Sequence, residues 1–123
     1  RDSAQAGAEV TDPTQLVDAV IEGIAADIRL RHTRGCPFIN AAAEYPDADG
    51  AVRRLIDEHR EWFRSTLQAV AEQAGLESPA DVAASLVLLR DAALVGGYLD
   101  GDERVTPAFA RTARSVVESH RPR

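Results

Sequence analysis

The side chains that could do chemistry are few and lie far apart in this sequence. Cys36 is the single cysteine and stands directly before Pro37, at an expected helix start. The positive end of a helix dipole lowers the pKa of a nearby thiol, which would suit a redox or electrophile sensor. Free cysteine more commonly packs as a small hydrophobic residue, and a lone cysteine lacks a second thiol to make the switch reversible. A packing role is therefore favoured.

His59 and the pair Asn40 and Glu44 are the polar residues best placed to contact a small molecule. His59 lies on an apolar helical stripe, one turn before Phe63. It fits a polar contact inside a largely apolar pocket, and equally a core histidine bonded to a backbone carbonyl or to Glu44. Asn40 and Glu44 lie one helical turn apart and could bond a ligand. A structural role is favoured for them, because buried polar groups need partners whatever the function.

Metal binding and catalysis find little support in the spacing of residues. The acidic turns 47–50 and 100–103 resemble calcium loops, but Tyr45, Ile56 and Tyr98 would occupy ligand positions that need oxygen donors. The histidines show no metal-ligand spacing. Neither a glycine-rich phosphate loop nor a nucleophile elbow is present. We therefore expect no metal and no cofactor, and an enzyme using His59 is the least favoured class of function.

Length and charge restrict the remaining classes. A chain of 123 residues suits one domain. Its net charge of −6 argues against a direct grip on DNA, because nucleic-acid affinity rests largely on neutralising phosphates. There is no apolar run of transmembrane length and no secretory signal pattern, and a single cysteine fits the reducing cytoplasm. The chain contains no methionine, so we expect it to be part of a longer protein.

Turn and capping residues divide the chain into helices. Asp12-Pro13, Ser78-Pro79 and Thr106-Pro107 each place a capping side chain before a proline at the first helical position. Gly75 is typical of the residue that ends a helix. The fold class predicted is all-α, with about five to six helices. Helices are expected at 13–31, 37–44, 51–74, 79–99 and 107–120, and residues 1–10 look frayed or like the remnant of a preceding helix.

The helix at 79–99 is the most apolar of these. Between Val82 and Leu99 its only polar residues are Ser85, Arg90 and Asp91. A helix that is apolar on nearly every face must be buried all round. In a domain of this size, the other helices form one packed layer that covers only one side of this helix. A second copy of the chain is expected to cover the other side. The alternative is the central helix of a monomer.

A stretch near the middle of the chain carries a family resemblance. The run RGCPFINAAAE at 34–44, then an acidic turn, then an amphipathic helix with His59, Trp62 and Phe63, resembles the C-terminal half of TetR-type transcriptional regulators. That resemblance implies one helical domain over residues 1–123 that binds a small-molecule effector and forms a homodimer in the bacterial cytoplasm. DNA would be bound, in a repressor, only through an N-terminal helix-turn-helix domain that this chain lacks.

The resemblance also implies where the sites lie. Mapped by position, the ligand-binding residues are Ile24, Ile28, Phe38, Ile39, His59, Trp62, Phe63, Thr66 and Leu67, with Leu94 or Tyr98 closing one end. The last two helices of each copy are expected to form a four-helix dimer interface through Leu86, Leu89, Arg90, Ala93, Gly97, Phe109, Ala110, Ala113 and Val117.

The implied lining is mostly aliphatic and aromatic, so the expected ligand is small and largely apolar. It would act by binding one spacing of the paired DNA-binding domains better than the other. The alternative is a helical homodimerisation or interaction module without a small-molecule site.

Overall fold

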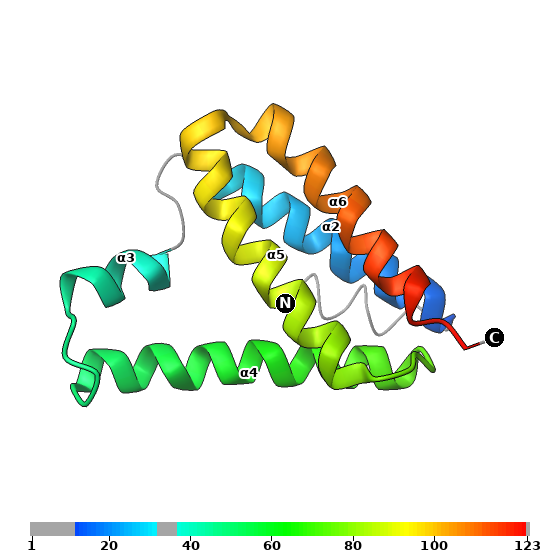
Figure 1. Cartoon of the computed structure of the whole chain (residues 1–123), viewed down its shortest axis with the longest axis horizontal. Coiled ribbons are helices and arrows are strands. Elements are labelled where there is room, and N and C mark those ends of the chain that lie inside the picture. The colour runs from blue at the N-terminus through cyan, green and yellow to red at the C-terminus, as the bar shows by residue number, and fades with distance from the viewer. Residues whose placement is uncertain (1–11, 32–36, 123) are drawn as a thin grey trace.

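The computed structural model describes residues 12–31 and 37–122 and shows five α-helices there (Figure 1). Their bounds are α2 Pro13–Arg31, α3 Pro37–Glu44, α4 Ala51–Gln73, α5 Pro79–Asp100 and α6 Asp102–Ser119. No strand occurs in these two ranges, so the predicted all-α fold is confirmed. The helix remnant expected at residues 1–10, and Cys36, lie outside the described residues.

The helix ends near Gly75 follow the predicted signals. Gly75 has a positive φ of 72°, and the backbone N–H of Leu76 donates to the carbonyl of Ala71, so a glycine stop ends α4 with a buried leucine behind it. Pro79 is the first residue of α5, as expected. Ser78 holds the N-cap position, but it adopts a left-handed conformation and its side chain makes no capping hydrogen bond.

The start of the last helix was predicted wrongly. The helix α6 begins at Asp102 and not at Pro107, which lies inside it. Gly101, with a φ of 94°, lets the chain turn from α5 into α6 through one residue, and two carboxylates then occupy the positive end of the new helix. Thr106 is consequently a buried helical residue and not a cap, and its hydroxyl has no hydrogen-bond partner within the described part of the chain.

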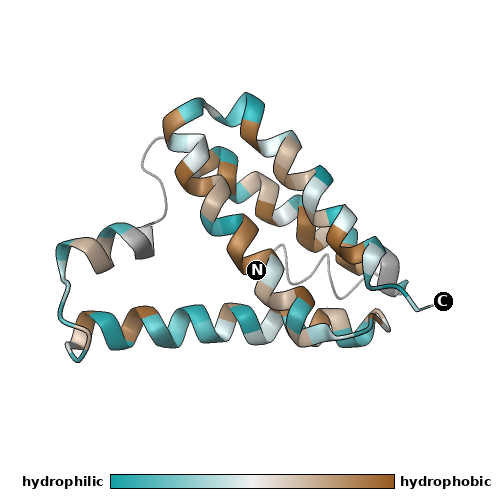
Figure 2. Cartoon of the chain, in the orientation of Figure 1, coloured by the Kyte–Doolittle hydropathy of each residue, from teal (hydrophilic) through white to brown (hydrophobic). Residues whose placement is uncertain are grey.

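The core lies among α2, α5, α6 and the C-terminal part of α4. Ile21, Ile28, Val82 and Leu94 are its largest fully enclosed side chains. Figure 2 shows apolar residues concentrated on α5 and hydrophilic residues along α4. Among the described residues, α3 contacts α4 and no other helix. The first half of α4 and α3 therefore form an arm, residues 37–59, that projects from the bundle (Figure 1).

The helix α5 differs from expectation in two ways. By length and composition it is apolar enough to cross a membrane, although no such run was predicted. It packs against α2, α4 and α6, and the core helix of a soluble bundle passes the same test, so this is weak support for a membrane span. Within one chain α5 is also not buried all round, because Leu88 and Leu99 are 69% and 70% exposed.

Candidate functional site

The predicted ligand-binding residues separate into a buried group and an exposed group. Ile24, Ile28, Leu67 and Leu94 are enclosed in the core of the bundle. His59, Trp62 and Thr66 of α4 and Tyr98 of α5 are exposed, and Phe63 is half-buried against the core. The side chains of Phe38 and Ile39 lie outside the described part. His59, Trp62 and Phe63 thus lie on α4, whereas Tyr98 lies on α5 and the described aliphatic members lie in the core.

An aromatic ledge, defined by His59, Trp62 and Phe63, lies where the arm joins the bundle. The rings of His59 and Trp62 are 5.6 Å apart between centroids and tilted by 41°. Trp62 is 61% exposed, which is uncommon for so large an apolar ring. The exposure of His59 makes the core-histidine interpretation wrong. Its predicted place on the inner stripe assumed that α4 packs along its whole length, whereas only its C-terminal part enters the core.

A cluster of four charges lies beside the ledge and was missed from the sequence. The guanidinium of Arg60 donates two hydrogen bonds to Asp91, at 3.0 and 2.6 Å. Arg90 donates to Asp27 at 3.1 Å, and its guanidinium lies 5.0 Å from the centre of the Phe63 ring. The available signal was that Arg90 and Asp91 are charged residues within an otherwise apolar helix, where charges need partners.

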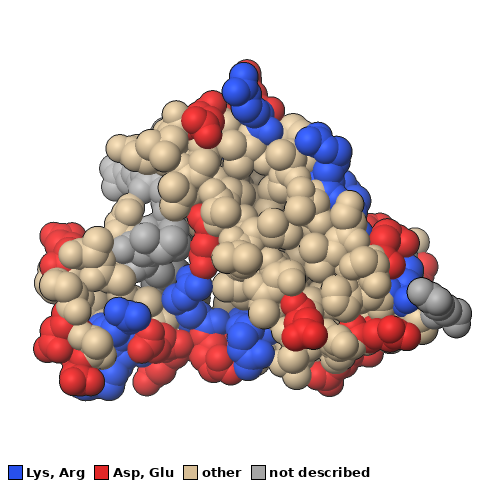
Figure 3. Space-filling view, in the orientation of Figure 1, with Lys and Arg blue, Asp and Glu red and all other residues tan. Residues whose placement is uncertain are grey.

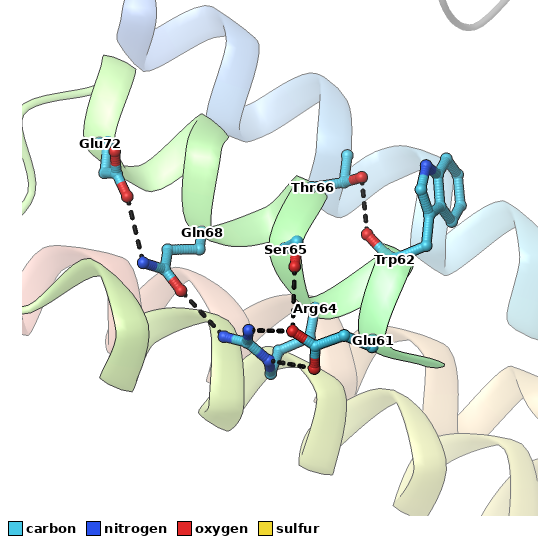
Figure 4. Close-up of polar contacts among 7 residues, drawn as sticks. All are labelled: Glu61, Trp62, Arg64, Ser65, Thr66, Gln68 and Glu72. Atoms are coloured by element: carbon cyan, nitrogen blue, oxygen red, sulfur yellow. Dashed lines mark hydrogen bonds and ion pairs between the residues drawn. The ribbon is translucent and has the colours of Figure 1, made fainter. Parts of the chain in front are cut away.

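The opposite face of α4 carries a solvated polar ladder. Figure 4 shows Arg64 bonding both Glu61 and Gln68, and Gln68 bonding Glu72, on a different side of the helix from Trp62. The hydrogen bond from Arg64 is the largest cause that lowers the pKa of Glu61 from its ordinary value, and a bond from Ser65 adds to it. The same contact raises the pKa of Arg64.

Three cavities in the described part of the chain include almost none of the predicted ligand-binding residues; Leu67 alone lines one of them. The core holds an apolar void of about 10 Å³, room for no more than one water-sized sphere. A hollow of about 290 Å³ lies between Asp18 of α2, Arg114 of α6 and Arg121, which follows α6, and charges of both signs meet there. Another of about 390 Å³ lies at the turn between α3 and α4. No group of three or more metal-ligating side chains occurs among the described residues.

The residues predicted for the dimer interface mostly face inward. Six of them are buried within the single chain: Leu86, Ala93, Gly97, Phe109, Ala113 and Val117. Leu89, Arg90 and Ala110 are partly buried. These six side chains are already covered within their own chain, so the predicted interface stays a prediction. The apolar side chains that α5 exposes include Ala84, Leu88, Ala92, Val95 and Leu99, with Tyr98 beside them.

The described helices form a bundle that ends in two long antiparallel helices, α5 and α6, with an arm at one side. The family model described as "Tetracyclin repressor-like, C-terminal domain" matches residues 13–113, and the chain belongs to this family. The crystal structure of SCO4454, a TetR-family transcriptional regulator from Streptomyces coelicolor, is similar with a TM-score of 0.87 and 32% sequence identity. The similarity covers 98% of this chain and 64% of that chain. No curated protein matches.

Proposed function

We propose that this chain is the effector-sensing and dimerisation domain of a TetR-type repressor that works in the cytoplasm. Membership of the TetR-like C-terminal family supports the regulator class. The chain spans 64% of the length of the SCO4454 chain, and we assign DNA binding to a helix-turn-helix domain in the remaining part of the parent protein. The domain itself carries a net charge of −6, which does not suit a phosphate-binding surface.

The main support for effector sensing is the exposed aromatic ledge. Large apolar rings are normally covered, and a group of exposed rings marks a candidate binding surface. Trp62 and His59 offer flat surfaces for stacking. Arg60 follows His59 on α4, and Arg90 of α5 lies over the ring of Phe63. The ligand class best suited to this pairing is a small, largely apolar aromatic molecule that carries a polar group.

The main support for dimerisation is the exposed face of α5. Ala84, Leu88, Ala92, Val95 and Leu99 follow one another at helical spacing and are all exposed. Figure 3 shows an uncharged surface over the middle of the molecule, with the charged residues gathered along α4 and at the edges. A continuous apolar stripe on a soluble helix favours an interface with a second copy.

A dye titration tests effector sensing. Trp62 is the single tryptophan, so energy transfer from it to bound anilinonaphthalene sulfonate, an anionic aromatic dye, reports dye binding to the domain, and the variants below locate the site. We expect saturable transfer and a melting temperature that rises with dye concentration. Substituting His59→Ala should weaken binding by about tenfold, the effect of losing one ring contact. Leu88→Ala, at an exposed apolar residue of α5 outside the ledge, is the matched control and should leave dye affinity unchanged.

Two outcomes would count against effector sensing. Dye binding that is equally weakened by Leu88→Ala would place the dye on α5 and not on the ledge. A dimer with no dye-dependent rise in melting temperature would favour the alternative, an interaction module without a small-molecule site.

A further inference from the structure

The four-charge cluster ties three helices together at one point. Asp27 comes from α2, Arg60 from α4, and Arg90 and Asp91 from α5. The contacts run in sequence: Asp27 to Arg90 at 3.1 Å, Arg90 to Asp91 at 4.0 Å, and Asp91 to Arg60 at 2.6 Å. Positive and negative charges are equal in number, so the cluster is neutral as a whole.

The cluster is partly enclosed, and unevenly so. The side chain of Arg90 is 12% exposed and that of Asp91 is 19% exposed, whereas Arg60 is 33% exposed. Arg90 is further held by the face of the Phe63 ring. Arg90 is therefore the fixed inner member, and Arg60 is the outer member that can reach water when it leaves Asp91.

The position of Arg60 along α4 gives the outer pair its significance. The residues of α4 that enter the main core, Leu67 and Ala71, all follow Arg60 in the chain. Before Arg60, the only buried residue of α4 is Ile56, which lies outside that core cluster. The Arg60–Asp91 pair thus lies where the arm, residues 37–59, leaves the bundle (Figure 1).

An ion pair at this point differs physically from an apolar contact. Breaking an apolar contact exposes hydrophobic surface to water, whereas opening a partly exposed ion pair returns two charges to a solvent that hydrates them well. While the pair is closed, its bidentate geometry nevertheless fixes the relative orientation of the guanidinium and the carboxylate. Such a contact can open and close without disturbing the core beneath it.

We propose that Arg60 and Asp91 form an ionic latch that sets the angle at which the arm leaves the bundle. Arg90 is the positioning residue of this latch: it holds Asp91 from one side while Asp27 and Phe63 hold Arg90. When the latch opens, the first half of α4 moves together with α3, and the bundle of α2, α5, α6 and the end of α4 stays in place. This inference goes beyond effector binding and is independent of it.

Hydrogen–deuterium exchange of the unliganded chain tests the latch. In Arg60→Gln we expect the backbone amides of 51–59 to exchange about tenfold faster, while those of α5 and α6 keep their wild-type rates. The wild-type chain, with the pair intact, is the slow-exchanging reference. Arg60→Lys keeps the charge but loses the bidentate contact, so it should fall between the two.

The exposed pair Arg53–Asp57, which lies wholly within α4, supplies the matched control. Arg53→Gln should leave exchange in 51–59 close to wild type. Unchanged exchange in Arg60→Gln would overturn the proposal. Faster exchange spread evenly over all helices would also overturn it, because the pair would then contribute only to global stability.

Discussion

At the scale of single residues, α4 presents two chemically distinct sides. One side carries Glu61, Arg64 and Gln68 in a solvated ladder, and the other carries Trp62, whose carbonyl accepts a hydrogen bond from Thr66 at 2.8 Å (Figure 4). The ladder has a simple origin, because polar residues off the apolar stripe of a helix face water. The exposure of Trp62 was not predicted, because a tryptophan on a helix margin is more commonly packed.

The pKa of Glu61 provides a test at this scale. Arg64 stabilises the ionised carboxylate, so the folded pKa lies below the ordinary value of 4.5. A carboxylate with a lowered folded pKa contributes stability above its unfolded value, and that contribution is lost as the pH falls through the lower folded value. Arg64→Gln should therefore raise the pKa of Glu61 toward 4.5, as measured by carboxyl-carbon NMR titration.

Arg53→Gln is the control for this titration. It removes an arginine of the same helix that bonds Asp57 and does not bond Glu61. An equal rise in the pKa of Glu61 in both variants would mean that general charge, and not the Arg64 hydrogen bond, is responsible.

At the scale of helices, most of the helix ends that proline or glycine marks were predicted correctly, and the start of α6 was not. Pro13, Pro79 and Gly75 each mark an observed helix end. Thr106-Pro107 carries the same type of signal, yet α6 starts at Asp102. The local signal loses because Gly101 allows an earlier turn, and because the added helix buries Thr106 and places Val105 against α5. Tertiary packing of this kind cannot be read from local spacing.

The proline inside α6 allows the position of the helix start to be tested. Pro107 cannot donate a hydrogen bond to the carbonyl of Glu103, and its ring strains the preceding turn. Pro107→Ala should raise the free energy of unfolding by about 1 to 2 kcal/mol, after allowing for the greater freedom of the unfolded variant. Thermal or urea unfolding measures this change.

Pro79, the first residue of α5, is the matched control, because proline is favoured there and Pro79→Ala should bring no gain. If Pro107→Ala likewise brings no gain, the helix starts at residue 107, as the sequence alone predicted.

At the scale of the whole molecule, a bundle and an arm meet at the aromatic ledge. The resemblance to TetR-type regulators allowed the fold to be predicted. A complete lining could not be predicted from the sequence. Ile28 and Leu94 are apolar helical residues, as pocket residues commonly are, but the bundle encloses both of them. Six of the residues predicted for the dimer interface are covered by their own chain for a related reason. Apolar residues cover nearly every side of α5, so periodicity does not tell which side faces its own chain.

Pairing is the central claim, because a receptor can alter the spacing of two DNA-binding domains only if two receptors are joined. The most direct test is the molar mass by light scattering at micromolar concentration. We predict twice the 13.2 kDa of the single chain. The variant Leu88→Arg with Leu99→Arg should be a folded monomer, whereas Leu55→Arg, equally exposed but on α4, should remain a dimer. A wild-type mass of 13.2 kDa across the concentration range would contradict the account.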